Sequence, residues 1–336
     1  MSMLPFSSLF LSTLVIGSLI SISSNHWILI WVGLELNLIS FIPLLFLSNF
    51  NTENEAAMKY FLAQALGSSL LLIGGTNLYF SAQSLISSSL SSYIILLGLL
   101  TKLGLPPCHF WFPSVMNSLS WPLCLILSTW QKVAPLLILT YLFSSLSFIT
   151  IALIITLSSL VGGVGGLSQS LLKPLLAYSS IGHMSWILAA GLSSLSSSLF
   201  YFLIYVIISS SIMFLLFLYN LFSLSSAALS SKFSWLIPCS LVLTFLSLGG
   251  VPPFLGFFPK WMVIQNLAEM GFFIPLILIL GSLLNLFYYL NFLFISLINK
   301  NTPLFIFPSK SFHISSWLLI LCSSSIFLAP IALVLF

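Results

Sequence analysis

Four charged side chains and one histidine lie inside long apolar runs of this sequence, where charge is expensive. They are Glu35, Lys102, Lys132, Lys260 and His183. A charge at the centre of a membrane costs roughly 2.5–3.5 kcal/mol on insertion scales. A low dielectric disfavours the ammonium form of lysine, and a nearby carboxylate favours it. A glutamate–lysine pair that closes and opens would therefore take up and release a proton, and a row of lysines could pass charge sideways by electrostatic coupling.

A structural explanation of these charges stands beside the chemical one. Ion pairs can fix helix packing, and a lysine near a helix end can extend its ammonium to the membrane surface. An ammonium that extends to the membrane surface suits Lys59 and Lys173, which lie at expected helix starts. It does not suit Lys132, which lies near the middle of its apolar run. We therefore expect a functional role for the four buried charges. For His183 both a relay role and a hydrogen-bonded core role stay open.

The composition excludes a protein whose main solvent is water. Of 336 residues, 60% are hydrophobic and 4% are charged, and the mean hydropathy is +1.21. A soluble domain carries about 25% charged residues. The net charge of +4 is too sparse for nucleic-acid binding. The four cysteines form no C-x-x-C motif or Cys/His cluster, so we expect no iron–sulfur site, zinc site or disulfide framework.

Continuous apolar runs predict an all-α polytopic membrane protein, because a transmembrane helix needs about 20 apolar residues and a barrel would alternate instead. The first run lacks the marks of a secretory or import peptide, so we expect it to be kept as a span. The loops are short, which favours a single membrane domain over 1–336. About eleven spans are predicted, at 4–23, 26–48, 57–80, 86–118, 122–144, 148–168, 174–193, 197–221, 236–270, 274–297 and 316–335.

The lysines of the predicted loops all fall on one side of the membrane. Lys173, Lys232, Lys300 and Lys310 lie in even-numbered loops, and Lys59 begins a helix on the same side. The positive-inside rule then places the N-terminus inside and the C-terminus outside.

The fourth and ninth predicted spans are long, and each contains a Pro pair. Residues 104–113 match residues 250–259 at five of ten positions, at an offset of 146. Proline interrupts a helix, and paired interrupted helices point to a transport site. Because the offset covers five spans, the two repeats run in opposite directions. We expect inverted repeats at about 1–146 and 147–297, with an extra C-terminal helix at about 316–335.

Six segments resemble one known family. There is no phosphate loop, nucleophile elbow or metal cluster beside them, so hydrolysis and redox chemistry are not expected in this chain. The sequence resembles the chain 2 family of mitochondrial NADH–ubiquinone oxidoreductase, a membrane subunit of complex I in animals. The motifs that carry the resemblance are Trp31-Val-Gly-Leu-Glu35-Leu-Asn37, Glu55-Ala-Ala-Met-Lys59-Tyr-Phe, Lys102-Leu-Gly-Leu-Pro-Pro-Cys-His109-Phe-Trp, Ser128-Thr-Trp-Gln-Lys132-Val-Ala-Pro135, Leu176-Ala-Tyr-Ser-Ser-Ile-Gly-His183-Met and Gly249-Gly-Val-Pro-Pro-Phe-Leu-Gly-Phe-Phe-Pro-Lys260-Trp.

The resemblance implies an antiporter-like fold and a proton relay. The fold would have two inverted five-helix repeats, with discontinuous helices at about 86–118 and 236–270. Glu35 would be the acid that pairs with Lys102 at the first break. Lys132 would be the central relay, and Lys260 would pass protons toward the intermembrane side or a neighbouring subunit. Cys108 and Ser185 depart from the family's usual residues without touching these charges.

The resemblance also implies where the chain works and with what. It implies that this chain binds no cofactor, whereas the complex uses NADH, FMN, iron–sulfur clusters and ubiquinone in other subunits. The implied partners are neighbouring antiporter-like chains, small core membrane chains and lipids such as cardiolipin, with no nucleic acid. The implied place is the mitochondrial inner membrane, with the N-terminus in the matrix and the C-terminus in the intermembrane space. The absence of Arg fits a mitochondrial gene.

Three other functions share parts of this pattern. A separate cation/proton antiporter would need a sodium-coordinating carboxylate cluster at the breaks, and none is evident. A structural scaffold of the membrane arm predicts that neutralising Lys132 leaves transport intact. An ion channel would need a filter or a charged ring supplied by several chains.

Overall fold

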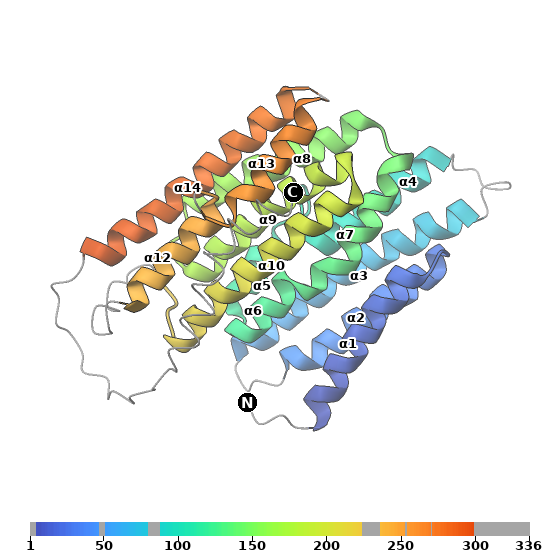
Figure 1. The fold of residues 1–336 in the computed structure, drawn as a ribbon. Coiled ribbons are helices and arrows are strands. Elements are labelled where there is room, and N and C mark those ends of the chain that lie inside the picture. Colours follow the sequence, from blue (N-terminus) through green and yellow to red (C-terminus); the bar gives the residue numbers. More distant parts are fainter. Residues whose placement is uncertain are drawn as a thin grey trace. The chain divides into compact units, whose positions relative to one another are not determined.

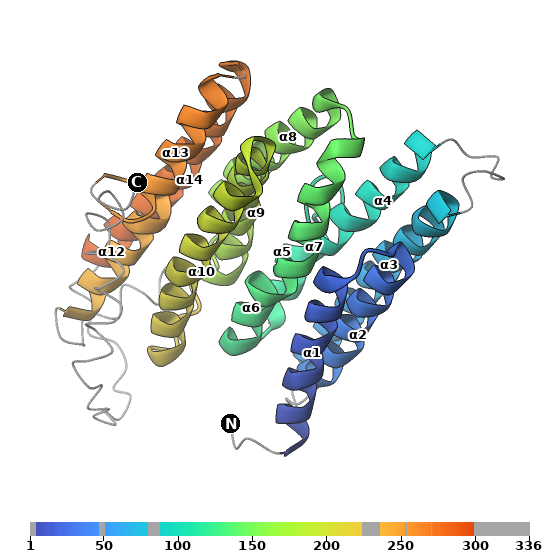
Figure 2. The same ribbon diagram turned by 45° about the vertical axis from the view of Figure 1, so that its right-hand side comes forward.

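The computed structural model describes residues 5–46, 51–79, 88–223, 236–252, 254–269 and 271–298. Almost all of these residues form α-helices, drawn in Figures 1 and 2. The chain divides into two compact units, one up to Ser158 and one from Ser159 onward. Each unit is described by itself below.

The first unit is built on neighbouring helices that pack in chain order. Helix α1 packs on α2, α2 on α3, and α3 on α4, while α7 packs against α4 and α6. Glycines allow close approach: a Cβ on Gly33 would lie 2.6 Å from the Ser21 nitrogen. The helices are α1 (Pro5–Ser23), α2 (Trp27–Leu45), α3 (Asn51–Tyr79), α4 (Ser88–Leu103), α5 (Trp111–Ser118), α6 (Trp121–Ser128) and α7 (Trp130–Leu142), followed by the short η1 (Phe143–Ser145).

The second unit is built around α9, which is buried along most of its length. Helices α10, α13 and α14 pack against it, and α12 packs against α10 and α14. The division between the units falls within α8. The helices are α8 (Phe148–Leu167), α9 (Leu172–Ser193), α10 (Leu195–Leu218), α12 (Leu236–Gly249), α13 (Phe257–Ala268) and α14 (Phe273–Ile298).

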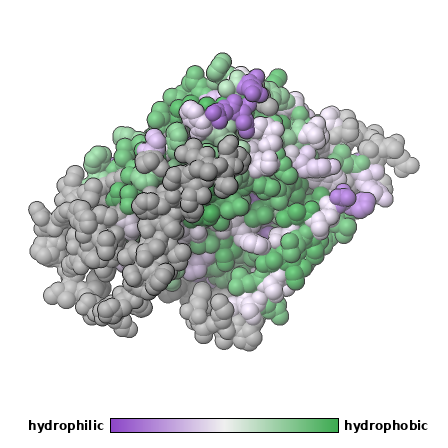
Figure 3. Space-filling model, viewed as in Figure 1, coloured by the Kyte–Doolittle hydropathy of each residue, from purple (hydrophilic) through white to green (hydrophobic). Residues whose placement is uncertain are grey.

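These helices confirm the predicted polytopic membrane fold. Eight helical stretches of the described residues are long and apolar enough to cross a membrane, when α6, α7 and η1 are taken together as one (Trp121–Ser145). Shorter apolar helices lie at Ser89–Leu103 and Ser240–Gly249. Large apolar side chains cover much of the face seen in Figure 3, as lipid contact requires. Ten predicted spans correspond to a helix or a helix pair. The eleventh, 316–335, lies outside the described residues, so the count of eleven stays a prediction.

Both predicted discontinuous helices are present, at equivalent positions. Helix α4 ends one residue before Gly104, which has a φ of 68°, and α12 ends one residue before Gly250, with a φ of 75°. Glycine adopts this left-handed conformation without the steric penalty that a Cβ brings. The two glycines are related by the offset of 146 that was found in the sequence. The inverted relation of the repeats and their boundaries stay predictions.

Two elements differ from the expected boundaries. The predicted span 122–144 is interrupted at Thr129, whose hydroxyl donates to the Leu125 carbonyl at 2.6 Å. Pro135, inside α7, also lacks the N–H that would bond the Gln131 carbonyl, so the backbone bonding just after Thr129 is weakened. Helix α3 begins at Asn51 rather than near 57, with Glu53 in its first turn, so Lys59 lies well inside the helix and not at its start. An acidic side chain in the first turn stabilises this earlier start.

Candidate functional site

The first charged pair joins α2 to α4. Lys102 Nζ lies 4.0 Å from Glu35 Oε1, and the side chains are 3% and 22% exposed respectively. Lys102 occupies the last turn of α4. A cation is favoured there, because the carbonyl end of a helix carries partial negative charge. The carboxylate and the helix end together compensate a lysine that is almost fully withdrawn from solvent.

The open carbonyl end of α4 is held by two neutral donors. Trp111 Nε1, from α5, donates to the Thr101 carbonyl at 3.0 Å. Gln64 Nε2, from α3, donates to the Lys102 carbonyl at 3.2 Å. Carbonyls at a helix end lack intrahelical partners and need such donors when buried. Groups of the protein itself therefore satisfy the carbonyls of Thr101 and Lys102 at the break.

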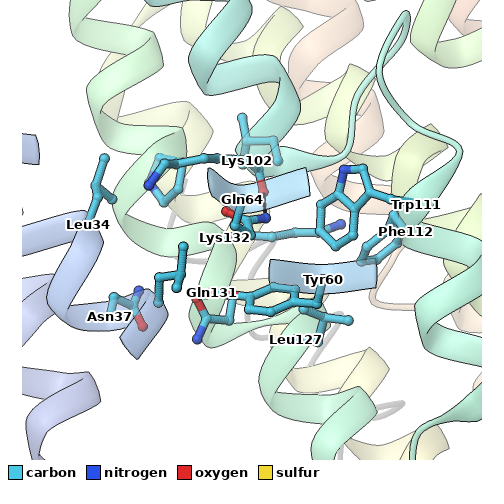
Figure 4. A pocket seen from close by; sticks show the side chains of 13 residues that line it. Leu34, Asn37, Tyr60, Gln64, Lys102, Trp111, Phe112, Leu127, Gln131 and Lys132 are labelled. Carbon is cyan, nitrogen blue, oxygen red and sulfur yellow. Dashed lines mark hydrogen bonds between the residues drawn. The ribbon is translucent and has the colours of Figure 1, made fainter. Parts of the chain in front are cut away.

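A polar cavity connects Lys102 with Lys132, and both lysines line it (Figure 4). Its space admits roughly one water molecule. The Tyr60 hydroxyl donates to Gln131 Oε1 at 3.5 Å. Within the part of the chain that the structure describes, Asn37 Oδ1 and Gln131 Nε2 are buried without a hydrogen-bond partner. Because buried polar atoms are usually satisfied, we expect an ordered water between them.

Lys132 lies in the first turn of α7 and is 2% exposed. Its Nζ is 4.4 Å from the centroid of the Phe112 ring, which belongs to α5. Figure 4 shows the side chain reaching toward this ring. The surroundings of the two cavity lysines therefore differ: a carboxylate lies beside Lys102, and an aromatic face is one of the contacts of Lys132.

In the second unit, Lys260 spans the second break. It lies in α13, and its Nζ donates to the carbonyl of Gly249, the last residue of α12, at 2.7 Å. The Nζ is also 5.8 Å from the Trp186 ring centroid. A Cβ on Gly250 would approach Lys260 Cδ and Nζ to 2.9 Å, so this lysine passes directly over the break. Here an ammonium, rather than a neutral group, donates to the helix end.

His183 lies on α9, beside the same break. Its Nδ1 is 3.2 Å from the Tyr201 hydroxyl, and the tautomer decides which atom donates. His183 lines a small pocket together with Leu248, Gly256 and Pro259, which flank the break between α12 and α13. This arrangement is compatible with both roles left open by the sequence.

The structure brings three of the five expected site residues together, namely Glu35, Lys102 and Lys132, and places Lys260 and His183 at the break of the second unit. Tyr60 and Phe112, which also line the cavity, were not among the expected site residues. The polarity of Asn37 and Gln131 in apolar runs was a usable signal, whereas an apolar ring beside a lysine leaves none. Among the described residues no group of three His, Cys, Asp or Glu side chains could hold a metal ion.

The fold and the paired breaks define an antiporter-like membrane subunit. Residues 24–285 match the family described as "NADH:quinone oxidoreductase/Mrp antiporter, TM". A chain of respiratory complex I from Thermus thermophilus is similar with a TM-score of 0.80 and 26% identity, over 98% of this chain and 77% of that one. A chain of the Mrp complex from Dietzia sp. DQ12-45-1b shares the fold, with a TM-score of 0.74 and 17% identity, over 84% of this chain and 59% of that one.

Sequence relatives narrow this class. The chain is 43% identical to NADH-ubiquinone oxidoreductase chain 2 of Lumbricus terrestris over 288 residues, which are 85% of each protein. It is 44% identical to the same subunit of Anopheles gambiae over 292 residues, or 85% of this chain and 84% of that one. The chain belongs to the NADH-ubiquinone oxidoreductase chain 2 family.

Proposed function

We propose that this chain is a proton-translocating membrane-arm subunit of respiratory complex I, and that Glu35, Lys102, Lys132 and Lys260 form its relay. The observation that carries the relay is the cavity lined by both Lys102 and Lys132, with Glu35 beside the first lysine. The chain 2 relatives and the complex I fold support membership of the complex. Oxidation of NADH and reduction of ubiquinone belong to other subunits, and this chain carries no cofactor.

The first step of the relay concerns the Glu35–Lys102 pair. While the pair is closed, the carboxylate stabilises the ammonium of Lys102. When the pair opens, the ammonium loses that compensation and gives its proton to the cavity. Tyr60 and one water can pass the proton toward the amine of Lys132, because a hydroxyl and a water each donate and accept at a single oxygen. Gln131 accepts the hydrogen bond of the Tyr60 hydroxyl and orients it.

The later steps use the second unit. Lys260 holds its charge against the carbonyl end of α12, and His183 with Tyr201 provides a second titratable group beside the same break. We propose that protons pass from Lys132 to Lys260 and then toward the intermembrane space or the neighbouring antiporter-like chain. The proposed setting is the mitochondrial inner membrane, with core membrane subunits and lipids such as cardiolipin as partners.

The test is Lys132→Met in the intact complex, reconstituted in proteoliposomes. Methionine keeps the length and the apolar stem, so packing loss is small. We expect fewer protons moved per NADH oxidised, or a collapse of both rates, in a complex that is intact on a native gel. Lys59→Met is the matched control, because Lys59 is exposed. Unchanged turnover and proton yield in Lys132→Met would favour the scaffold function instead.

A further inference from the structure

We propose that Phe112 is a positioning residue of the relay: its ring is a seat that holds the Lys132 side chain only while that lysine is protonated. The inference rests on the relay proposed above and adds a second position for its central lysine. A cation is attracted to the face of an aromatic ring within about 6 Å of the centroid, and a neutral amine is not. The 4.4 Å between Lys132 Nζ and the Phe112 centroid meets this condition.

Burial makes this contact stronger than its surface equivalent. Phe112 is 1% exposed and Lys132 is 2% exposed. Attraction between a cation and a ring grows when water is excluded. The ring therefore contributes to the compensation of a charged Lys132, whereas an uncharged Lys132 gains little from it.

The other position available to Lys132 lies on the polar side of the same cavity, which Phe112 also lines. Gln131, Tyr60 and Asn37 line the cavity and offer hydrogen bonds that a neutral amine can accept or donate. A lysine that takes up a proton there would gain by moving to the ring, and one that loses the proton at the ring would gain by returning. Movement between the two positions would separate proton uptake from proton release, which a relay with a direction requires.

The seat is attached to the broken helix. Phe112 lies in the first turn of α5, and a Cβ on Gly104 would lie 2.9 Å from Phe112 Cβ. Its neighbour Trp111 donates to the carbonyl end of α4. The ring thus packs directly on the turn that separates α4 from α5. Any rearrangement of this break moves the seat relative to Lys132 and changes how well it holds the ammonium.

Phe112→Leu and Phe112→Tyr separate the ring face from mere packing. Leucine keeps an apolar side chain and removes the ring. We expect this change to lower the fraction of Lys132 side chains at position 112 about tenfold. We expect Phe112→Leu to lower the proton yield per NADH at least by half. Phe112→Tyr keeps an aromatic ring, so we expect it to keep the yield of the unsubstituted complex. A high-resolution structure of the intact Leu variant should show Lys132 Nζ turned toward Gln131 and Tyr60, on the polar side of the cavity. Phe110→Leu is the control, because Phe110 lies in the same break and is 74% exposed.

The outcomes distinguish this inference from the relay itself. If Lys132→Met abolishes pumping while Phe112→Leu pumps normally with Lys132 unmoved, the seat is wrong and the relay stands. If Lys132→Met pumps normally, the relay fails and the seat has no function to serve. Equal losses in Phe112→Leu, Phe112→Tyr and Phe110→Leu would show a packing effect and overturn the inference.

Discussion

At the scale of single residues, the two partners of the Glu35–Lys102 pair differ in solvent exposure, and this difference suits a switch. Lys102 is almost fully buried, whereas Glu35 keeps 22% exposure. At 4.0 Å the two groups are at the outer limit of an ion pair. A small movement of the carboxylate therefore removes most of the compensation of the lysine without unpacking the helices, because the lysine is the partner that is withdrawn from bulk solvent.

Glu35→Gln tests whether this pair acts as one unit. The amide keeps the size of the side chain and removes the charge that compensates Lys102, so we expect a lower proton yield in an assembled complex. Because residues of one ion pair are coupled, adding Lys102→Met to Glu35→Gln should lower the yield no further. The measurement is proton uptake per NADH oxidised in proteoliposomes for both single variants and the double variant.

Glu55→Gln is the matched control for this series, since Glu55 is an exposed acid near the start of α3. It should leave the proton yield unchanged. Losses that add in the double variant would mean that Glu35 and Lys102 act separately, and the pair would then lose its place as the first step of the relay.

Sequence reasoning finds charged site residues well and apolar ones poorly. The cost of burying a charge marks Lys132 in an apolar run, and the structure does bury it. Phe112 carries no such mark, because the chain has 31 Phe residues and their side chains look alike in sequence. Only the position of the ring over the ammonium identifies it, and that position depends on how α5 folds back across the break.

At the scale of helices, the two breaks have the same kind of glycine turn, and they differ in the groups that donate hydrogen bonds to the carbonyl end of the first half-helix. Each has a left-handed glycine directly after its first half-helix. Neutral groups of Trp111 and Gln64 donate to the carbonyl end of α4, whereas the ammonium of Lys260 donates to that of α12. The bond at the second break is charge-assisted, and such bonds are roughly twice as strong as neutral ones. The second break should therefore respond more directly to the proton on its lysine.

Gly250→Ala tests this connection. An L-residue in the left-handed conformation costs about 1–2 kcal/mol, and the new Cβ would displace Lys260 from the carbonyl of Gly249. We expect lower heat resistance of the assembled complex on native gels and a lower proton yield. Gly249→Ala is the control, because its Cβ would meet its nearest neighbour at an ordinary 3.5 Å. Equal behaviour of the two variants would contradict a special role for the turn.

The helix breaks illustrate what local sequence can predict. Gly104 and Gly250 are each followed closely by a Pro pair, and this pattern predicts both discontinuous helices. Proline and glycine change the conformation of their own backbone, so their effect can be predicted from the local sequence. The interruption at Thr129 was not predicted. Threonine is common inside apolar helices, and Thr76 makes the same hydroxyl bond to the preceding turn in α3, where the helix continues. Neither the residue type nor this bond therefore marks an interruption in the sequence.

At the scale of the whole molecule, the described part of each compact unit contains a helix broken at a left-handed glycine and at least one buried lysine. In the proposed relay, each unit would supply a membrane-embedded charge beside an interrupted helix. The direction of such a relay depends on which end of each helix faces the matrix. The lysine distribution predicts that the N-terminus is inside, and α8 offers the simplest place to test it.

Single cysteines at the two ends of α8 would be labelled from opposite sides. The helix has 20 residues, and at 1.5 Å per residue it is about 30 Å long, the thickness of a bilayer core. Ser145 and Ser168 flank it and are exposed. In mitoplasts, a membrane-impermeant maleimide should label Ser145→Cys directly and Ser168→Cys only after detergent, because Ser168 shares its loop side with Lys173. The unsubstituted complex gives the background of the native cysteines. The reverse pattern would invert the proposed topology and with it the direction in which Lys260 passes protons.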